Sequence, residues 1–418
     1  MAVLGIRRED KNPWERRAPL TPHHVEELVR ELGVTVAIEP SEKRIYSDQA
    51  YREAGAELTD DLSGCRLILG VKEVPPEQVL ASTTYLCFAH VIKGQPQGMP
   101  LLQRMLQQNS TLIDYEPIVD RFGRRLVFFG RHAGYAGMID ALWALGQRME
   151  HEGVETAFSG VKRAFDYKSV AEACETLVKD VGVRIREQRL SSSLHPLVIG
   201  FTGGGNVSRG AQEILDHLPV VEIEPDELKS LADRPELSRR VIYKVVFRRP
   251  DRLQFSRHLP HLTMLVNGIY WEPGHPKLAT RGELRDLWQR QPNPRLKVLA
   301  DLSCDIDGSI EATVQSTTPN DPVFVFDPES GKATLGVAGR GPVVLAVDNL
   351  PAEFPRDSTE HFGDSLFPFV SGLLAADYSA SFEHLALPAA ILPAVITHGG
   401  ELTPRYRNLE EALTKETR

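Results

Sequence analysis

Lys72 and His90 each follow a short apolar run that ends just before the ionisable side chain. The runs, 66–71 and 85–89, have the length and composition of buried strands in a parallel sheet. Ligands bind beyond the carboxyl ends of such strands, so neighbouring strands would place Lys72 and His90 at one pocket. There they could exchange protons with a substrate. The alternative is that both are solvated turn residues.

A second group of residues has the composition of a dinucleotide-binding loop. The segment 201–208 (FTGGGNVS) lies between an apolar run at 197–200 and a helical pattern that begins at 210–215. A pyrophosphate needs a tight turn, a backbone without Cβ atoms in its path, and the N–H groups of a helix N-terminus. Ser208 stands where a third glycine is usual. The expected loop residues are Gly203, Gly204, Gly205, Asn206, Val207 and Ser208.

The choice between NAD and NADP stays open at this stage. Glu224 follows the next expected strand, 220–223, about twenty residues beyond the loop, where an acidic group binds the ribose 2′-OH of NAD. Basic residues that could instead offset the 2′-phosphate of NADP follow: Arg239, Arg240, Lys244, Arg248 and Arg249.

Elements of βα type surround both groups of residues. Residues 1–150 show expected strands at 2–6, 34–38 and 126–130, in addition to the two already described, and helices at 21–31, 47–54 and 99–108. Beyond 150, a capping box at Ser169 and Glu172 opens a helix to about 181. Further strands are expected at 243–247, 262–266, 298–302 and 343–347.

Composition excludes several classes of protein. The chain has 418 residues, 42% of them hydrophobic and 25% charged, with a net charge of −9, which argues against a nucleic-acid binder. An expected strand begins almost at Met1 and no run approaches a membrane span, so we expect a cytoplasmic protein without membrane contact. The 4 cysteines are widely separated, which predicts buried thiols and no metal site.

Segments along nearly the whole chain resemble the lysine-2-oxoglutarate reductase domain of the bifunctional aminoadipic semialdehyde synthases. That domain is related to lysine-forming saccharopine dehydrogenase and to alanine dehydrogenase. The resembling segments, which are long and occur in order, are 7–22, 67–76, 88–93, 112–116, 128–139, 201–214, 267–272, 301–311 and 348–370.

The resemblance implies an α/β fold with two Rossmann-like domains and an active site in the cleft between them. The substrate domain would comprise 1–150 and 355–418, because the tail returns to it in the relatives, and 151–354 would bind the dinucleotide. The bifunctional relatives continue into a second dehydrogenase module, whereas no second glycine-rich loop follows here. We therefore expect a free-standing reductase, and a homo-oligomer is compatible with the resemblance.

The implied reaction joins L-lysine to 2-oxoglutarate and reduces the imine to saccharopine with NADPH, or with NADH as the alternative. Deprotonating a lysine ε-amine at pH 7 costs roughly 4.6 kcal/mol, so a base must assist. By the resemblance, Lys72 exchanges the proton on the bridging nitrogen and His90 serves carbinolamine formation and dehydration. Lys72 then needs a lowered pKa.

The substrates carry three carboxylates, which call for cations, arginine above all. Arg17 and Lys93 match motif positions, and Arg131 departs from the uncharged residue expected there. Glu15 and Glu116 would hold the lysine α-ammonium or tune Lys72, with helix capping or surface pairing as the alternative. Implied cofactor contacts, for which turn stabilisation is the alternative at the aspartates, are Asn267, Gly268, Asp301 and Asp305.

Two other functions compete with the reductase. An NAD-dependent saccharopine dehydrogenase would run toward lysine with the same Lys72 and His90, and Glu224 favours it on charge grounds. A nucleotide-binding regulator would keep the fold without turnover, against which the joint presence of Lys72, His90, Arg17 and Lys93 counts. Alanine dehydrogenase fits less well, because pyruvate needs fewer basic groups than an extended lysine-glutarate adduct.

Overall fold

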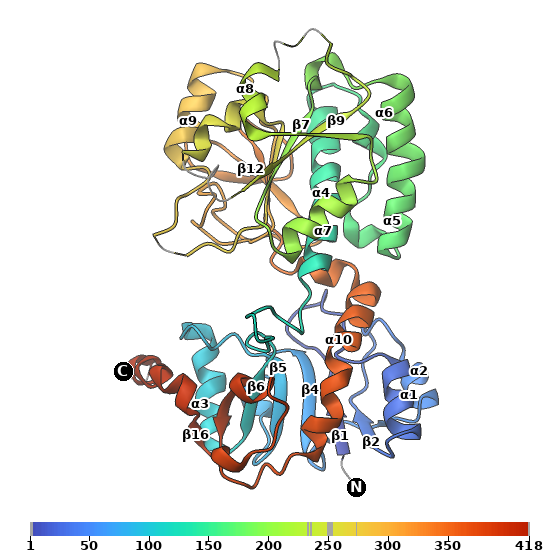
Figure 1. Cartoon of the computed structure of the whole chain (residues 1–418), viewed down its shortest axis with the longest axis vertical. Coiled ribbons are helices and arrows are strands. Elements are labelled where there is room, and N and C mark those ends of the chain that lie inside the picture. The colour runs from blue at the N-terminus through green and yellow to red at the C-terminus, as the bar shows by residue number, and fades with distance from the viewer. Residues whose placement is uncertain (1–2, 232–233, 235, 249–253, 273, 417–418) are drawn as a thin grey trace. The chain divides into compact units, whose positions relative to one another are not determined.

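A computed structural model describes residues 3–231, 234, 236–248, 254–272 and 274–416. The chain forms two compact units, which we call unit 1 (Met1–Phe129 with Pro355–Arg418) and unit 2 (Gly130–Phe354) (Figure 1). The expected boundary at 150 is wrong by one helix. Helix α4 (Gly130–His151) packs on helix α7 (Asn206–Leu215) and strand β11 (Val298–Asp301), so it belongs to unit 2.

The sheet of unit 1 has 8 strands in the order β16-β15-β6-β5-β4-β1-β2-β3. Its core is parallel, and β15 and β16 at one edge are antiparallel. The two strands that precede Lys72 and His90, β4 and β5, are neighbours. The strands are β1 (Val3–Ile6), β2 (Thr35–Ile38), β3 (Glu57–Leu58), β4 (Leu67–Lys72), β5 (Thr84–Phe88), β6 (Thr111–Asp114), β15 (Val395–His398) and β16 (Glu401–Leu402).

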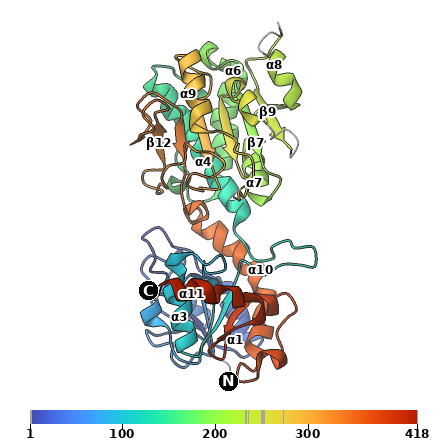
Figure 2. The same ribbon diagram turned by 90° about the vertical axis from the view of Figure 1, so that its left-hand side faces the viewer.

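The tail contributes a core helix to unit 1. Helix α10 buries Phe362, Leu366 and Val370, and the Phe362 ring stacks on Phe129 with centroids 4.3 Å apart. Figure 2 shows α10 and α11 in the same unit as α1 and α3. The α-helices of this unit are α1 (Pro22–Arg30), α2 (Asp48–Glu53), α3 (Met99–Gln107), α10 (Pro355–Ala375) and α11 (Glu410–Glu416).

One expected strand of unit 1 is wrong. Residues 126–130 form no strand; Arg125 makes an isolated bridge with Val119, and α4 begins at Gly130. The apolar run exists because Phe129 is buried against Phe362. Strand β6, which the sequence pattern did not indicate, instead pairs with β5.

The sheet of unit 2 also has 8 strands, in the order β13-β12-β14-β11-β10-β7-β9-β8. It is parallel apart from β12 and β13. In the common dinucleotide fold the second strand lies beside the first, whereas here β9 lies between β7 and β8. The strands are β7 (Val198–Thr202), β8 (Val220–Ile223), β9 (Ile242–Phe247), β10 (Met264–Asn267), β11 (Val298–Asp301), β12 (Val323–Phe326), β13 (Ala333–Leu335) and β14 (Val343–Leu345).

Helices α4 and α7 of unit 2 cross at glycines. A Cβ added at Gly134 would lie 2.1 Å from the Val207 carbonyl oxygen, and one at Gly210 would lie 2.3 Å from that of Arg131. The helix expected from Ser169 is α5 (Val170–Thr176), which continues as a π-helical turn at Leu177–Gly182. The other α-helices of unit 2 are α6 (Val183–Gln188), α8 (Leu228–Leu231) and α9 (Arg281–Arg290).

The 4 cysteines are free thiols, two of them buried. Within the described ranges, no helix is both long and apolar enough to cross a bilayer. Over the same residues, no group of three or more His, Cys, Asp or Glu side chains is arranged to hold a metal ion.

Candidate active site and cofactor loop

Side chains that could carry chemistry gather at one edge of the sheet of unit 1. Lys72 ends β4, His90 follows β5, and the Glu15–Arg17 segment follows β1. These strands are parallel neighbours in the order β5-β4-β1, so their carboxyl ends meet at the same edge. The parallel sheet therefore brings Lys72 and His90 to the same edge, as the predicted pocket requires.

Lys72 is held at the backbone by a buried carboxylate. The Lys72 N–H donates to Glu9 Oε2 at 3.0 Å, and the Val71 N–H donates to Glu9 Oε1 at 2.6 Å. Burial lowers the pKa of Lys72, and the nearby Arg17 guanidinium lowers it further. A lysine that loses its proton more readily than usual is suited to proton exchange with a bound nitrogen.

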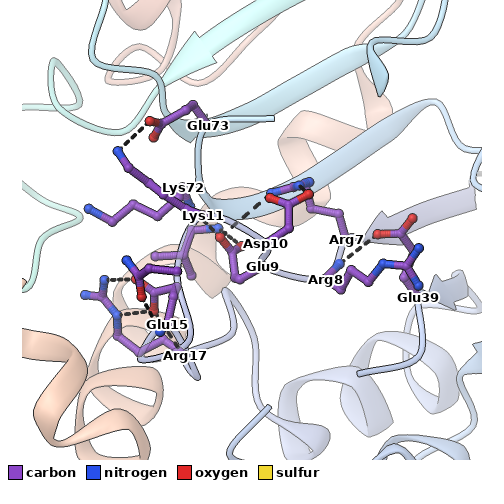
Figure 3. A network of polar contacts seen from close by, with 12 residues as sticks. Arg7, Arg8, Glu9, Asp10, Lys11, Glu15, Arg17, Glu39, Lys72 and Glu73 are labelled. Carbon is purple, nitrogen blue, oxygen red and sulfur yellow. Dashed lines mark hydrogen bonds and ion pairs between the residues drawn. The ribbon is translucent and has the colours of Figure 1, made fainter. Parts of the chain in front are cut away.

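Glu15 and Arg17 form a buried ion pair beside Lys72. Arg17 Nε donates to Glu15 Oε1 at 2.7 Å, and a terminal nitrogen donates to Oε2 at 2.5 Å. The guanidinium lies over the Phe129 ring, 4.1 Å from its centroid. Sequence reasoning gave the two side chains separate substrate contacts, and the structure brings them together as partners. In Figure 3, Lys72 lies between this pair and the Lys11–Glu73 pair.

His90 is oriented by Glu73, the residue after Lys72. Its backbone is left-handed, with φ +54°, and its Nδ1 lies 3.1 Å from Glu73 Oε2. Lys11 Nζ donates to Glu73 Oε1 at 2.5 Å. Burial opposes the ionisation of Glu73, but the hydrogen bonds from His90 and Lys11 outweigh it and lower its pKa to about 2. Glu73 is therefore an anion at neutral pH that is bonded to both His90 and Lys11.

Sequence reasoning missed three carboxyl groups near the site: Glu9, Glu73 and Asp114. Burial raises the pKa of Glu9 to about 7, although Arg7 opposes the shift. Burial also raises the pKa of Asp114 to about 7, and Asp114 accepts hydrogen bonds from the backbone N–H groups of Ala89 and Glu116. The available signal was that each carboxyl lies at or just after the end of an apolar strand.

The other expected substrate contacts are Lys93, Glu116 and Arg131. Lys93 is exposed and lines a pocket of about 500 Å³ whose other wall includes Asn408, Leu409 and Ala412 of the tail. Glu116 accepts a hydrogen bond from Arg125. Arg131 lies in the first turn of α4 in unit 2, where it pairs with Glu213 of α7.

The glycine-rich segment of unit 2 has the geometry of a phosphate loop. Gly203 has φ +92°, and a Cβ there would lie 2.5 Å from the Gly268 carbonyl oxygen. Over the described residues, a Cβ at Gly204 or Gly205 would have no neighbour within 4 Å, so open space adjoins the backbone. Gly205 precedes α7 without a side-chain cap, which leaves the N–H groups of Asn206, Val207 and Ser208 at the helix N-terminus. These residues fit a dinucleotide pyrophosphate.

Asn267 and Asp301 belong to a hydrogen-bond network at the strand ends beside this loop. Both side chains are fully buried. Asn267 accepts from Thr202 Oγ1 at 2.8 Å and donates to Asp301 Oδ1 at 2.9 Å, while Asp301 Oδ2 accepts from Thr313 Oγ1 at 2.6 Å. These bonds join the ends of β7, β10 and β11 to one another, and direct cofactor contact by the two residues stays a prediction.

The remaining residues of the expected cofactor site are Gly268, Asp305 and Glu224. Gly268 packs closely on the loop, since a Cβ there would lie 3.0 Å from the Ser208 nitrogen. Asp305 is half-buried in the segment after β11. Glu224 is exposed after β8, and its backbone N–H donates to Glu227 Oε2 at 2.8 Å. Arg249, one of the basic residues considered beside it, lies outside the described residues.

This fold is that of the alanine dehydrogenase class, as expected from the sequence. Residues 5–136 match the family described as "Alanine dehydrogenase/PNT, N-terminal domain". A structure of L-alanine dehydrogenase matches with a TM-score of 0.66 and 18% identity, covering 99% of both chains. A transhydrogenase from Sinorhizobium meliloti matches with a TM-score of 0.55 and 16% identity, covering 96% of this chain and 98% of that one.

Sequence similarity is greater to a more particular group. The mitochondrial alpha-aminoadipic semialdehyde synthase of Bos taurus is 36% identical over 98% of this chain and 48% of its own length. The Arabidopsis thaliana enzyme is 37% identical over 97% of this chain and 41% of its own length. A lysine-forming saccharopine dehydrogenase of Neurospora crassa is 28% identical over 88% of this chain and 90% of its own.

The chain is thus a relative of the alpha-aminoadipic semialdehyde synthases, which confirms the resemblance seen in the motifs. It spans about half the length of these curated relatives.

Proposed function

We propose that the chain is a lysine-2-oxoglutarate reductase, which condenses L-lysine with 2-oxoglutarate and reduces the imine to saccharopine. The observation that carries this proposal is the cluster at the sheet edge of unit 1. It combines Lys72, whose pKa is lowered by burial, with His90 held on Glu73, an anion at neutral pH. Similarity to the synthases along nearly the whole chain supports the same activity.

The proposed chemistry needs proton transfers at two atoms. The ε-amine of the substrate lysine loses a proton as it adds to the ketone carbon, and the carbinolamine oxygen gains one as water leaves. His90 is half-exposed, so it can exchange protons with solvent and serve both transfers. Reduction leaves a secondary amine on the bridging nitrogen, and we assign the proton exchange at that nitrogen to Lys72.

A bound dihydronicotinamide would supply hydride to the imine carbon, and the glycine loop of unit 2 would hold its pyrophosphate. Arg17 would act on Lys72 through its charge, since both of its bonds to Glu15 fix it beside the lysine. We keep Arg17 and Lys93 as proposed partners of substrate carboxylates.

The proposal is tested by the absorbance at 340 nm of purified protein with NADPH or NADH, with lysine and 2-oxoglutarate added together and separately. Oxidation that requires both substrates, with saccharopine identified by mass spectrometry, is the expected result. Lys72→Met should abolish it. Oxidation with pyruvate and ammonium instead would establish an alanine dehydrogenase, and activity unchanged in Lys72→Met would refute the assigned chemistry.

The rival reading, an NAD-dependent saccharopine dehydrogenase that works toward lysine, is checked in the same wells. Consumption of NADH alone would favour it. The observation that supported it was the position of Glu224 in the sequence.

A further inference from the structure

The two predicted acid–base residues of unit 1 follow strands whose ends are held in the same way. Strand β4 extends beyond the end of β1, and its last two N–H groups, those of Val71 and Lys72, donate to the buried Glu9 carboxylate. Just after the next strand, β5, the Ala89 N–H donates to Oδ2 of Asp114. In both places a buried carboxyl side chain accepts backbone N–H groups where the strand ends, next to the acid–base residue.

Asp114 joins the ends of two strands. It is the last residue of β6, lies opposite Cys87 of β5 and is fully buried. A backbone bond of 3.2 Å runs from the Tyr115 N–H to the Cys87 carbonyl oxygen. Beyond it, Oδ2 of Asp114 accepts from the Ala89 N–H at 3.3 Å, and Oδ1 accepts from the Glu116 N–H at 2.8 Å. One carboxylate thus fixes both chains as they leave the sheet.

His90 needs this support because its backbone is strained. Its φ of +54° lies in the left-handed region, which residues other than glycine rarely adopt because their Cβ crowds the following carbonyl oxygen. Such a conformation persists only where its surroundings over-determine it. Two contacts do so here. The preceding N–H, that of Ala89, is bonded to Asp114, and Gly98 packs so closely that a Cβ there would lie 2.7 Å from the His90 carbonyl oxygen.

The backbone of His90 determines where its ring lies. With this backbone, Nδ1 of the ring is 3.1 Å from Glu73 Oε2. Lys72 lies opposite Phe88, so the two predicted acid–base groups are separated by only two residues along the direction of the strands. A change of φ at His90 would move the ring relative to both Glu73 and Lys72. Misplacement of a reacting group by about 1 Å can lower turnover about 100-fold.

We propose that Asp114 is a positioning residue for His90: by fixing the backbone at Ala89, it holds the left-handed turn that places the imidazole for proton transfer. Its own carboxyl is buried and engaged by two backbone N–H groups, so it acts through His90. The inference deepens the proposed function and rests on it in taking His90 as an acid–base group. Glu9 provides an internal comparison, because it supports Lys72 instead.

The first test is a double-mutant cycle with Asp114→Asn and His90→Gly. The asparagine amide keeps one acceptor oxygen, and the shorter bond to the Glu116 N–H should retain it, so the Ala89 N–H loses its acceptor. Burial raises the pKa of Asp114 to about 7, so the assays use about pH 8, where both oxygens of the wild-type carboxylate accept.

In otherwise wild-type protein, Asp114→Asn should lower kcat with lysine, 2-oxoglutarate and NADPH about 10- to 100-fold, with each KM changed less than about threefold. In His90→Gly, imidazole in the buffer replaces the missing ring. There the same change should lower kcat less than about threefold, because no tethered ring remains to be positioned.

The second test needs no turnover. Diethyl pyrocarbonate modifies histidine rings, and mass spectrometry follows the rate at His90, with the exposed His217 as reference. Asp114→Asn should raise the rate at His90 about threefold or more, because the ring loses its place against Glu73. Glu9→Gln, which alters the support of Lys72, should leave this rate within about twofold.

Asp140→Asn is the matched control. Asp140 is a buried carboxyl of unit 2 that also accepts from a backbone N–H, that of Ala164 at 2.7 Å. This variant should leave kcat within about twofold with and without His90. Circular dichroism would show that each variant is folded, and Asp114→Ser, which also removes Oδ2, replaces Asp114→Asn if the latter does not fold.

Three outcomes would overturn the inference. Asp114→Asn could lower kcat by the same factor with and without His90, which is the mark of a general structural effect. It could raise KM alone, or it could leave the rate of His90 modification unchanged.

Failure of this inference is distinguishable from failure of the proposed function. If wild type oxidises no NADPH with the two substrates, the reductase assignment fails, and the modification rates still decide whether Asp114 positions His90. If wild type is active but the effects of Asp114→Asn and His90→Gly are independent, the reductase assignment stands and the positioning role is refuted.

Discussion

Lys72 lies among charges of both signs, so its protonation depends on a balance. Arg17 and Lys11 disfavour its ammonium form, whereas Glu15 and Glu73 favour it. Burial tips the balance toward the neutral amine. The ion pair of Glu15 and Arg17 thus adjusts the acidity of a third residue in addition to holding the loop in place.

Neutralising either member of this pair should shift the pKa of Lys72 in opposite directions. Arg17→Gln removes a cation and leaves Glu15, so the pKa should rise; Glu15→Gln leaves Arg17 dominant, so it should fall. The measurement is the pH dependence of Lys72 amidination by mass spectrometry, which needs no activity.

The double variant Glu15→Gln with Arg17→Gln is the control, because it restores a neutral pair. Its Lys72 pKa should lie between those of the two single variants. Breaking a buried pair costs about 3–5 kcal/mol, so folding of each single variant must be checked. If the pKa of Lys72 shifted in the same direction in both single variants, the proposed balance of charges around Lys72 would be refuted.

Glu73 should matter for turnover through His90. Glu73→Gln keeps a hydrogen-bond acceptor but removes the charge that orients and stabilises a protonated His90. We expect kcat/KM to fall about 10-fold or more, because the His90 ring loses its charged partner. Glu77→Gln, on the exposed turn after β4, is the matched control. Equal kcat/KM values in the Glu73→Gln and Glu77→Gln variants would exclude a role of Glu73 in turnover.

Among the elements, the crossing of α4 and α7 has no room for a side chain. Gly134→Ala would bring its Cβ to 2.1 Å from the Val207 carbonyl oxygen, so the helices must separate. We expect a loss of about 1–3 kcal/mol in the free energy of unfolding. Gly282→Ala in α9 meets only Thr280 Oγ1 at 4.0 Å and should stabilise by about 0.5–1 kcal/mol. Urea unfolding compares the two, and equal effects would contradict the close crossing.

A second element contact in unit 2 should make its stability depend on pH. Asp140 of α4 and Glu353 of the segment before α10 are buried carboxyls, and burial raises the pKa of Asp140 to about 6. Because the folded-state pKa is raised, the stabilisation is complete below the ordinary pKa and is lost as pH rises through about 6.

Asp140→Asn should therefore flatten the fall in unfolding temperature between pH 4 and about 7, since its amide oxygen can still accept from the Ala164 N–H. Calorimetry across this range measures the slope. The exposed Asp226→Asn is the control, and a slope unchanged by Asp140→Asn would refute the assignment.

Most strands could be predicted because each is an apolar run of strand length, and adjacency of parallel strands then predicted where Lys72 and His90 would lie. The run at 126–130 misled because Phe129 is apolar for its contact with Phe362, far away in sequence. Local periodicity cannot distinguish burial by a sheet from burial by a distant helix. Two other features could not be predicted because they too depend on tertiary structure. They are the pairing of Glu15 with Arg17 and the exchanged positions of β8 and β9.

At the scale of the whole molecule, each unit has hydrophobic clusters of its own. A ligand bound to one unit should therefore stabilise mainly that unit. 5′-AMP, which forms half of NAD⁺, should slow hydrogen exchange in β7 and α7, with little change in β4 and β5. Mass spectrometry of peptides measures this, and protection confined to unit 1 would refute the loop as its site.

The return of the tail into unit 1 has a consequence during protein synthesis. Residues 130–354 are continuous and can fold as soon as they leave the ribosome. Unit 1 must wait for Phe362 and for β15, which pairs with β6 across a long stretch of sequence. The nascent chain thus exposes the apolar partners of α10 until α10 itself has been synthesised. Vectorial synthesis should complete unit 2 before unit 1.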